Sequence, residues 1–190
     1  MIRNAFSIVL IILALCSIYF GAYLPLRKAQ LYISALNEVR NVRTMEGFRE
    51  MFLKAFAFYS PIGDEEMAKF FGNDTINIVL QQKQNEAVAR EFVAFTKPFL
   101  MKNNVRHLII LSNLHSILWK EYGRKADFVQ AENYLRTALV FGPKLPPVLY
   151  GLLDLYQYRG DREKIREIAT TILTYWPSDT DVQTILADNS

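Results

Sequence analysis

The sequence is poor in several residue types on which whole classes of protein depend. Its 190 residues include one cysteine and two histidines, which excludes a disulfide scaffold and a cysteine-rich zinc site. Eight glycines and seven prolines are too few for a turn-rich all-β fold. The 22 basic and 19 acidic residues leave a net charge of only +3, whereas nucleic-acid binding usually requires a dense basic face. We therefore expect no nucleic-acid partner.

Charge is absent from one long run near the N-terminus. Residues 5–24 read AFSIVLIILALCSIYFGAYL and contain no charged side chain. At about 1.5 Å per residue, a helix of this run is about 30 Å long, which is the hydrocarbon thickness of a bilayer. Tyr19 and Tyr23 lie near its end, where aromatic rings favour the interface, and Arg27 and Lys28 follow. The sequence therefore predicts a transmembrane helix, with the lipid bilayer as the partner of residues 5–24.

A cleaved signal peptide is the alternative to this anchor. The apolar region of a signal peptide usually has about 7–15 residues and ends at small residues. The run here is longer, and its best cleavage site, Phe20-Gly21-Ala22, has phenylalanine where a small residue is required. We therefore expect an uncleaved single-pass anchor in the bacterial inner membrane, with cleavage after residue 22 as the alternative. The basic residues on both sides of the run give conflicting signals, so the side of the C-terminal part is left open.

The rest of the chain is rich in apolar residues at helical spacing. Hydrophobic residues make up 51% of the sequence and aromatic residues 13%, which excludes disorder over most of the length. Ile165, Ile168, Ala169 and Ile172 illustrate the spacing, and no stretch alternates as a strand would. The sequence predicts an all-α fold. The expected helices span 5–24, with a bent continuation to about residue 40, 44–59, 63–71, 74–96, 104–122, 127–141, 147–158, 161–175 and 179–187.

The polar residues form no pattern that is typical of catalysis. His107 and His115 lack accompanying metal ligands, so both are interpreted as histidines satisfied within a helix interface. Acidic residues 64–66 suit the first turn of a helix, where the helix dipole favours negative charge. We therefore predict that the protein is not an enzyme and holds no metal and no cofactor. Three residues are predicted to cap helix N-termini: Asn73, Asp161 and Ser178.

The C-terminal half repeats with a period of about 34 residues. A shift by this number aligns Pro143 with Pro177 and Leu118 with Leu152. This is the length of the helix–turn–helix unit of the tetratricopeptide repeat. Residues 112–145 and 146–179 each resemble such a unit. The positions that carry the resemblance are Leu118, Tyr122, Phe128, Ala131, Leu135, Ala138 and Pro143 in the first unit, and Leu152, Tyr156, Gly160 and Pro177 in the second.

The resemblance implies an α-solenoid of antiparallel helix pairs after the transmembrane helix. Trp119 departs from the family pattern, which prefers a small residue there. The predicted organisation is a transmembrane anchor in residues 1–30, degenerate helical repeats in 31–103, and two tetratricopeptide-like units plus a capping helix in 104–190. The register of residues 62–103 and the oligomeric state are left open.

The resemblance also implies a function. In tetratricopeptide arrays the first helices of the pairs form a concave surface that binds a protein or peptide partner. On this basis the chain is expected to be a membrane-anchored interaction module, a scaffold or adaptor without catalysis of its own. The exposed positions on the first helices form the predicted partner-binding groove: Asn113, Ser116, Lys120, Tyr150, Asp154, Gln157 and Tyr158.

A second interpretation has a different functional class. One span followed by degenerate repeats, with SPIGDEE at residues 60–66 between them, loosely resembles the tail of bacterial O-antigen ligase or polymerase-like proteins. The additional spans that carry catalysis in those proteins are absent from this sequence. The resemblance therefore implies at most an accessory part, or a split-off tail, of a cell-surface polysaccharide system.

Overall fold

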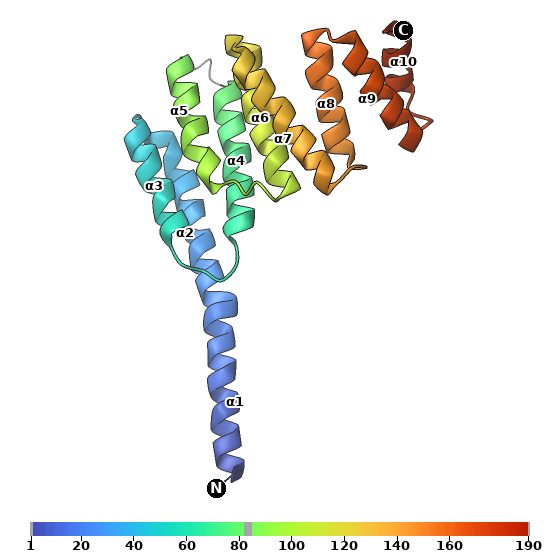
Figure 1. Cartoon of the computed structure of the whole chain (residues 1–190). Coiled ribbons are helices and arrows are strands. Elements are labelled where there is room, and N and C mark those ends of the chain that lie inside the picture. Colours follow the sequence, from blue (N-terminus) through green and yellow to red (C-terminus); the bar gives the residue numbers. More distant parts are fainter. Residues whose placement is uncertain (1, 82–84, 190) are drawn as a thin grey trace. The chain divides into compact units, whose positions relative to one another are not determined.

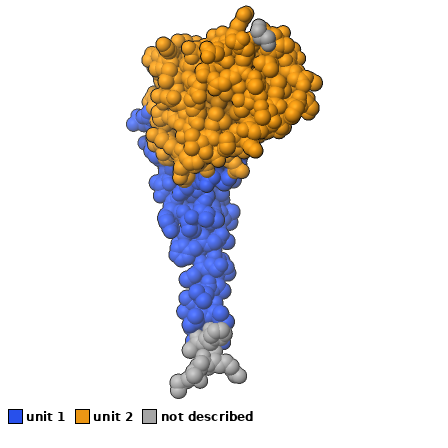
Figure 2. All heavy atoms as spheres, turned by 45° about the vertical axis from the view of Figure 1, so that its right-hand side comes forward, with its two compact units in different colours: residues 1–70 blue, residues 71–190 orange. Residues whose placement is uncertain are grey.

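The computed structural model describes residues 2–81 and 85–189. The regular structure of these residues is entirely helical, and no strand occurs among them (Figure 1). The predicted all-α class is therefore confirmed. The contacts divide the chain into two compact units, residues 1–70 and 71–190, which are coloured separately in Figure 2. This division falls inside the predicted segment 31–103.

The first unit begins with two helices that form one continuous rod. Helix α1 (Ile2–Ile18) leads through a π-helical turn (Tyr19–Tyr23) into α2 (Leu24–Glu38). In this turn the N–H of Leu24 bonds to the carbonyl of Tyr19. The wide turn directly precedes Pro25, which has no N–H to donate to an α-helical hydrogen bond. The predicted continuation of the helix beyond Pro25 is confirmed, and the π-helical turn is its local irregularity.

The rod contains a stretch, Ser7–Glu38, that is long and apolar enough to cross a membrane. Only 6% of its most hydrophobic part is buried inside the protein. Leu13 and Leu15 on α1 are 59% and 61% exposed. A core helix of a soluble protein would bury such side chains, so that alternative does not fit. A membrane span and a signal sequence both agree with the length and composition of the stretch.

The remainder of the first unit packs against α2. Helix α3 (Met45–Ala57) begins at Thr44, whose side chain accepts a hydrogen bond from the N–H of Gly47 at 3.2 Å. The rings of Phe48 and Phe52 on α3 lie 4.8 Å apart, and that of Phe52 lies 5.8 Å from the ring of Tyr32 on α2. These three buried aromatic side chains hold α3 against α2.

The second unit continues with helices that pack in chain order. From α5 on, each helix contacts the next one along the chain. Gly123 and Gly160 end α6 and α8 in the left-handed region, both with φ of 74°, a conformation that favours glycine. The helices are α4 (Asp64–Gln81), which begins in the first unit, α5 (Glu86–Thr96), α6 (Val105–Tyr122), α7 (Lys125–Phe141), α8 (Pro146–Arg159), α9 (Arg162–Tyr175) and α10 (Thr180–Asp188).

The predicted helix break between residues 71 and 74 is wrong. Helix α4 passes through this region, so Asn73 lies inside a helix and caps none. Gly72 is buried, and a Cβ atom there would lie 2.6 Å from Cγ2 of Ile110 on α6. Glycine therefore permits a close approach of α4 to α6 and does not end the helix. The N-cap of α5 is Asn85, which follows residues 82–84 that lie outside the described part of the chain.

The two other predicted N-caps gave different outcomes. The side chain of Asp161 accepts a hydrogen bond from the N–H of Lys164 at 3.2 Å and caps α9, as predicted. The cap of α10 is Asp179, which accepts from the N–H of Val182 at 3.0 Å, so the assignment of this role to Ser178 is wrong. Serine and aspartate are both good N-cap residues. The turn in which the N–H of Asp179 bonds to the carbonyl of Trp176 places Asp179 at the start of α10.

Small residues of α7 lie in the core of the second unit. Ala131 and Ala138 are both 0% exposed. The carbonyl of Ala131 accepts a hydrogen bond of 3.0 Å from the hydroxyl of Ser112 on α6. A hydrogen bond from a short serine side chain to the backbone of another helix requires the two helices to be close. Both alanines, which carry the resemblance to the tetratricopeptide repeat, are therefore buried at this contact.

We expect Ala138→Phe to destabilise the second unit by about 1–3 kcal/mol, because added volume in a filled core forces neighbouring side chains and backbone to move. The control is Val140→Phe on the same helix, at a side chain that is 80% exposed. Thermal unfolding followed by helical circular dichroism compares the two variants. Equal melting temperatures for Ala138→Phe and the wild type would show that this face of α7 is not tightly packed.

Candidate binding groove

A hollow of about 220 Å³ lies where side chains of α4, α6, α7 and α8 meet. We call it the α6–α8 groove. All three predicted partner-binding positions on α6 and one on α8 line it: Asn113, Ser116, Lys120 and Asp154. Ile76 of α4 and Leu135 of α7 add apolar surface, and Gly151 of α8 adds backbone. The groove therefore combines apolar walls with an amide, a hydroxyl and both signs of charge.

An ion pair joins the two helices across this groove. Nζ of Lys120 lies 2.9 Å from Oδ2 of Asp154, and the two residues are 34 positions apart in the sequence. The repeat period predicts this juxtaposition, and the pair confirms it. The side chains are 28% and 69% exposed. An ion pair so open to water contributes less than about 1 kcal/mol to stability, so its charges remain accessible to a ligand.

Tyr158 lies beside this ion pair at the end of α8. Nζ of Lys120 is 4.9 Å from the centroid of the Tyr158 ring, and the ring of Trp119 is 5.1 Å from it. Trp119 also contacts Phe128 of α7 at 4.9 Å, so the large side chain that departs from the family pattern packs between α6, α7 and α8. Tyr158 is 58% exposed and extends the same surface beyond Lys120.

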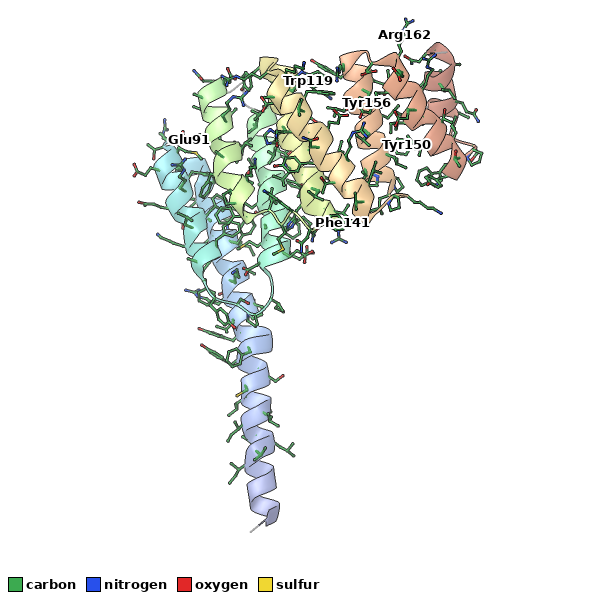
Figure 3. The ribbon with its side chains drawn as sticks, viewed as in Figure 1. Glu91, Trp119, Phe141, Tyr150, Tyr156 and Arg162 are labelled. Carbon is green, nitrogen blue, oxygen red and sulfur yellow. The ribbon has the colours of Figure 1, made fainter. Side chains whose placement is uncertain are left out.

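Tyr150 belongs to a different hollow. Its hydroxyl donates a hydrogen bond to the carboxylate of Asp179, and its ring lies 6.3 Å from that of Trp176. Tyr150 is labelled in Figure 3. The hydrogen bond raises the pKa of Tyr150 and lowers that of Asp179. Both residues line a hollow of about 310 Å³ next to Pro146. Gln157 is exposed on α8 and lines neither hollow. The predicted groove residues thus do not share one hollow: four line the α6–α8 groove, one lines the second hollow, and Gln157 lines neither.

Tyr156, which is labelled in Figure 3, connects α8 to α7 through hydrogen bonds. The side chain is 1% exposed, yet its hydroxyl is satisfied, because it donates to Glu132 at 2.6 Å and accepts from Arg136 at 2.8 Å. Burial raises the pKa of Tyr156, and the hydrogen bond to Glu132 raises it further. A buried tyrosine with both hydrogen bonds made orients α8, which carries Asp154 and Gly151 into the groove.

A charged cluster that the sequence reasoning missed joins α5, α6 and α7. Nη1 and Nη2 of Arg90 on α5 donate to Asp127 on α7, at 3.2 and 2.6 Å, and its Nε donates to Glu86 at 2.8 Å. Nδ1 of His115 on α6 lies 3.1 Å from the same carboxylate. Asp127 is 4% exposed. The sequence held one signal of this site: Asp127 falls at helical spacing from Ala131 and Ala138, so an acid occupies a core-facing position.

Electrostatics keeps this cluster in one charge state at neutral pH. Burial raises the pKa of Asp127, but the hydrogen bonds from Arg90 and His115 lower it more, so the pKa lies below its usual value. Burial lowers the pKa of His115, and its hydrogen bond to Asp127 only partly opposes this. At neutral pH the cluster is therefore an arginine–carboxylate pair with a neutral histidine. We interpret the cluster as a set of contacts that stabilises the packing of α5, α6 and α7.

The other histidine is also buried and hydrogen-bonded. His107 is 0% exposed, and its Nδ1 accepts a hydrogen bond of 2.9 Å from the N–H of Met101. The Nδ1 contacts of both histidines agree with the prediction, whereas Nε2 of His115 is buried without a hydrogen-bond partner among the described residues. Within residues 2–81 and 85–189, no three side chains of Cys, His, Asp or Glu come together as metal ligands.

The sequence matches no model of a known protein family, and no curated protein matches it.

Proposed function

We propose that the protein is a membrane-anchored, non-catalytic interaction module in which a tetratricopeptide-like solenoid binds a peptide or protein segment. The contacts between α6 and α7 support paired helices of opposite direction. Ser112 meets Ala131, whereas Trp119, further along α6, meets Phe128, which lies earlier on α7. The left-handed glycines after α6 and α8 support a repeated helix–turn–helix unit.

The observation that carries the binding role is the pairing of Lys120 with Asp154 at the α6–α8 groove. In a solenoid, the first helices of successive pairs form an extended concave surface. Most residues that line the groove come from α4, α6 and α8, which are alternate helices along the chain, and Leu135 of α7 adds one side chain. A backbone segment of a partner would find a cation, an anion, an amide and a hydroxyl there, next to apolar walls. This mixture suits an extended peptide better than a small apolar ligand.

The anchor completes the proposal. The apolar stretch on α1 and its exposed side chains support a single span, which we place in a bacterial inner membrane. An anchored binding groove concentrates its partner at the membrane surface. The module therefore acts as an adaptor or scaffold that recruits a partner to the bilayer.

Charge reversal in the ion pair tests the groove. We expect Lys120→Glu and Asp154→Lys each to weaken capture of the wild-type-selected peptides by about fivefold or more, which corresponds to about 1 kcal/mol. The detergent-solubilised full chain is first used to select binders from a displayed peptide library. Each variant is then compared with the wild type on those peptides. The double variant Lys120→Glu with Asp154→Lys restores the ion pair with reversed polarity. We expect its binding of the selected peptides to remain weak, because the partner recognises the position of each charge.

The matched control reverses the exposed pair of Lys164 and Glu167 on α9, which are 2.6 Å apart. We expect Lys164→Glu with Glu167→Lys to bind the selected peptides as the wild type does. Full recovery by the Lys120/Asp154 double variant would show that the pair acts only within the protein. A wild-type chain that selects no peptide would contradict the proposed binding function.

A further inference from the structure

The connection between α3 and α4, residues 58–63, contacts Lys28 of α2 at both of its ends. Nζ of Lys28 donates a hydrogen bond of 2.8 Å to the carbonyl of Phe58. The same ammonium forms an ion pair with Asp64, the first residue of α4. Lys28 is 3% exposed and Asp64 is 57% exposed, so the ammonium is buried while its carboxylate partner faces outward. Figure 1 shows the connection crossing the rod where α2 begins.

This attachment sets the depth of the connection relative to the apolar run. Lys28 comes one helical turn after Leu24, the last residue of the run, which is about 6 Å along the helix axis. The headgroup layer on each side of the hydrocarbon core is about 5–7 Å thick. Tyr19 and Tyr23, with 49% and 53% of their surface exposed, lie at the end of the run as interfacial tyrosines do. An anchor that ends at Leu24 therefore holds the connection within the headgroup layer.

The side chains of the connection suit that layer. Residues 58–63 read FYSPIG and contain no charge. Tyr59 is 69% exposed and Ile62 is 60% exposed. Ser60 is buried, and its hydroxyl donates to the carbonyl of Ile62 at 2.7 Å, which stabilises the turn between them. Asp64 forms an ion pair with the ammonium of Lys28, and the exposed acids Glu65 and Glu66 begin only after the connection has ended.

We propose that residues 58–63 form a second membrane contact, in which Tyr59 and Ile62 insert into the headgroup layer of the bilayer that α1 crosses. This inference rests on the proposed anchoring and goes beyond it, because the connection is separated from the span in the sequence. The contact involves an apolar isoleucine and an amphipathic tyrosine, so it requires a lipid surface and no particular headgroup. It fixes the first unit to the membrane at two points and restricts its tilt.

Site-specific fluorescence in vesicles tests this contact. The native chain carries one cysteine, Cys16, which lies in the apolar run. A Cys16→Ser background allows single cysteines to be introduced as Tyr59→Cys, Ile62→Cys and, as the matched control, Glu46→Cys. Glu46 is exposed near the other end of α3, about 16 Å along the helix from the connection. Each chain is labelled with an environment-sensitive dye in detergent and reconstituted into phosphatidylcholine vesicles that contain nitroxide lipid.

We expect the dye at positions 59 and 62 to be quenched by shallow nitroxide at least about twofold more than the dye at position 46. Labelling of the native Cys16 reports the anchor separately, through quenching by deep nitroxide. If position 16 is quenched while positions 59 and 62 match position 46, the second contact is wrong and the anchor stands. If position 16 is not quenched either, the proposed anchoring fails and this inference fails with it.

Discussion

Replacement of Ile12 and Leu13 by arginine is expected to release the protein from the membrane. Both residues lie near the middle of the apolar run, and their side chains are 53% and 59% exposed. Each arginine at the centre of a span costs about 2.5–3.5 kcal/mol on insertion scales, so the pair costs about 5–7 kcal/mol. The wild type should resist extraction from membranes by alkaline carbonate, whereas the double variant should appear in the soluble fraction. Ile12→Val with Leu13→Ile is the matched control and should remain membrane-bound.

The mass of the mature chain separates the anchor from a signal peptide. An uncleaved anchor retains residues 1–22, whereas cleavage would leave a product that begins near Tyr23. A full-length mass together with extraction of the arginine variant would support the anchor. Cleavage of the wild type, or a double-arginine variant that stays in the membrane fraction, would contradict it.

The second large effect is expected at the buried charged cluster of the second unit. Arg90→Met removes the guanidinium and leaves the carboxylate of Asp127, which is 4% exposed, without its cation. A buried charge without its partner typically costs about 3–5 kcal/mol. The Arg90 side chain is 27% exposed, which allows water to approach, so we expect a loss near the lower limit, about 3 kcal/mol. Thermal unfolding in detergent, followed by helical circular dichroism, measures the change.

Two further variants make this prediction specific. Arg124→Met removes one of the two cations beside the more exposed Glu86, from which Arg124 lies 2.6 Å away, and leaves Arg90 at 2.8 Å, so it should cost less than about 1 kcal/mol. Arg90→Met combined with Asp127→Asn removes the buried charge together with its partner, and should recover part of the lost stability. Equal melting temperatures for Arg90→Met and Arg124→Met would show that the cluster does not hold the helices together.

Helix positions could be predicted from the sequence wherever the signal was local. The apolar stripe around Ile168 and the glycines at 123 and 160 define α9 and the ends of α6 and α8, because periodicity and left-handed turns depend on neighbouring residues. The break predicted at Gly72 failed for a different reason. Whether a glycine ends a helix or permits a close approach depends on what it faces, and Gly72 faces Ile110 of another helix.

In the groove, the sequence predicted the position of some side chains but not of others. The repeat period placed Lys120 beside Asp154, because equivalent positions of stacked units are neighbours. It could not place Tyr150, whose hydroxyl bonds to Asp179 in the turn before α10. A tyrosine on the correct helix face still has rotational freedom, and the nearest strong acceptor determines its direction. That acceptor belongs to a segment whose position no local pattern indicates.

The sequence by itself determined the helical class, the long apolar run and most helix ends, since each depends on composition or on spacing within one segment. Only the tertiary structure decided which charges meet. Arg90 and Asp127 lie on helices separated by α6, and their pairing depends on how α5 and α7 pack against it. Likewise, Lys28 meets the carbonyl of Phe58 only because α3 folds back onto α2. Side chains distant in sequence are brought together by packing, and the free energy of that packing is distributed over many contacts that no short motif records.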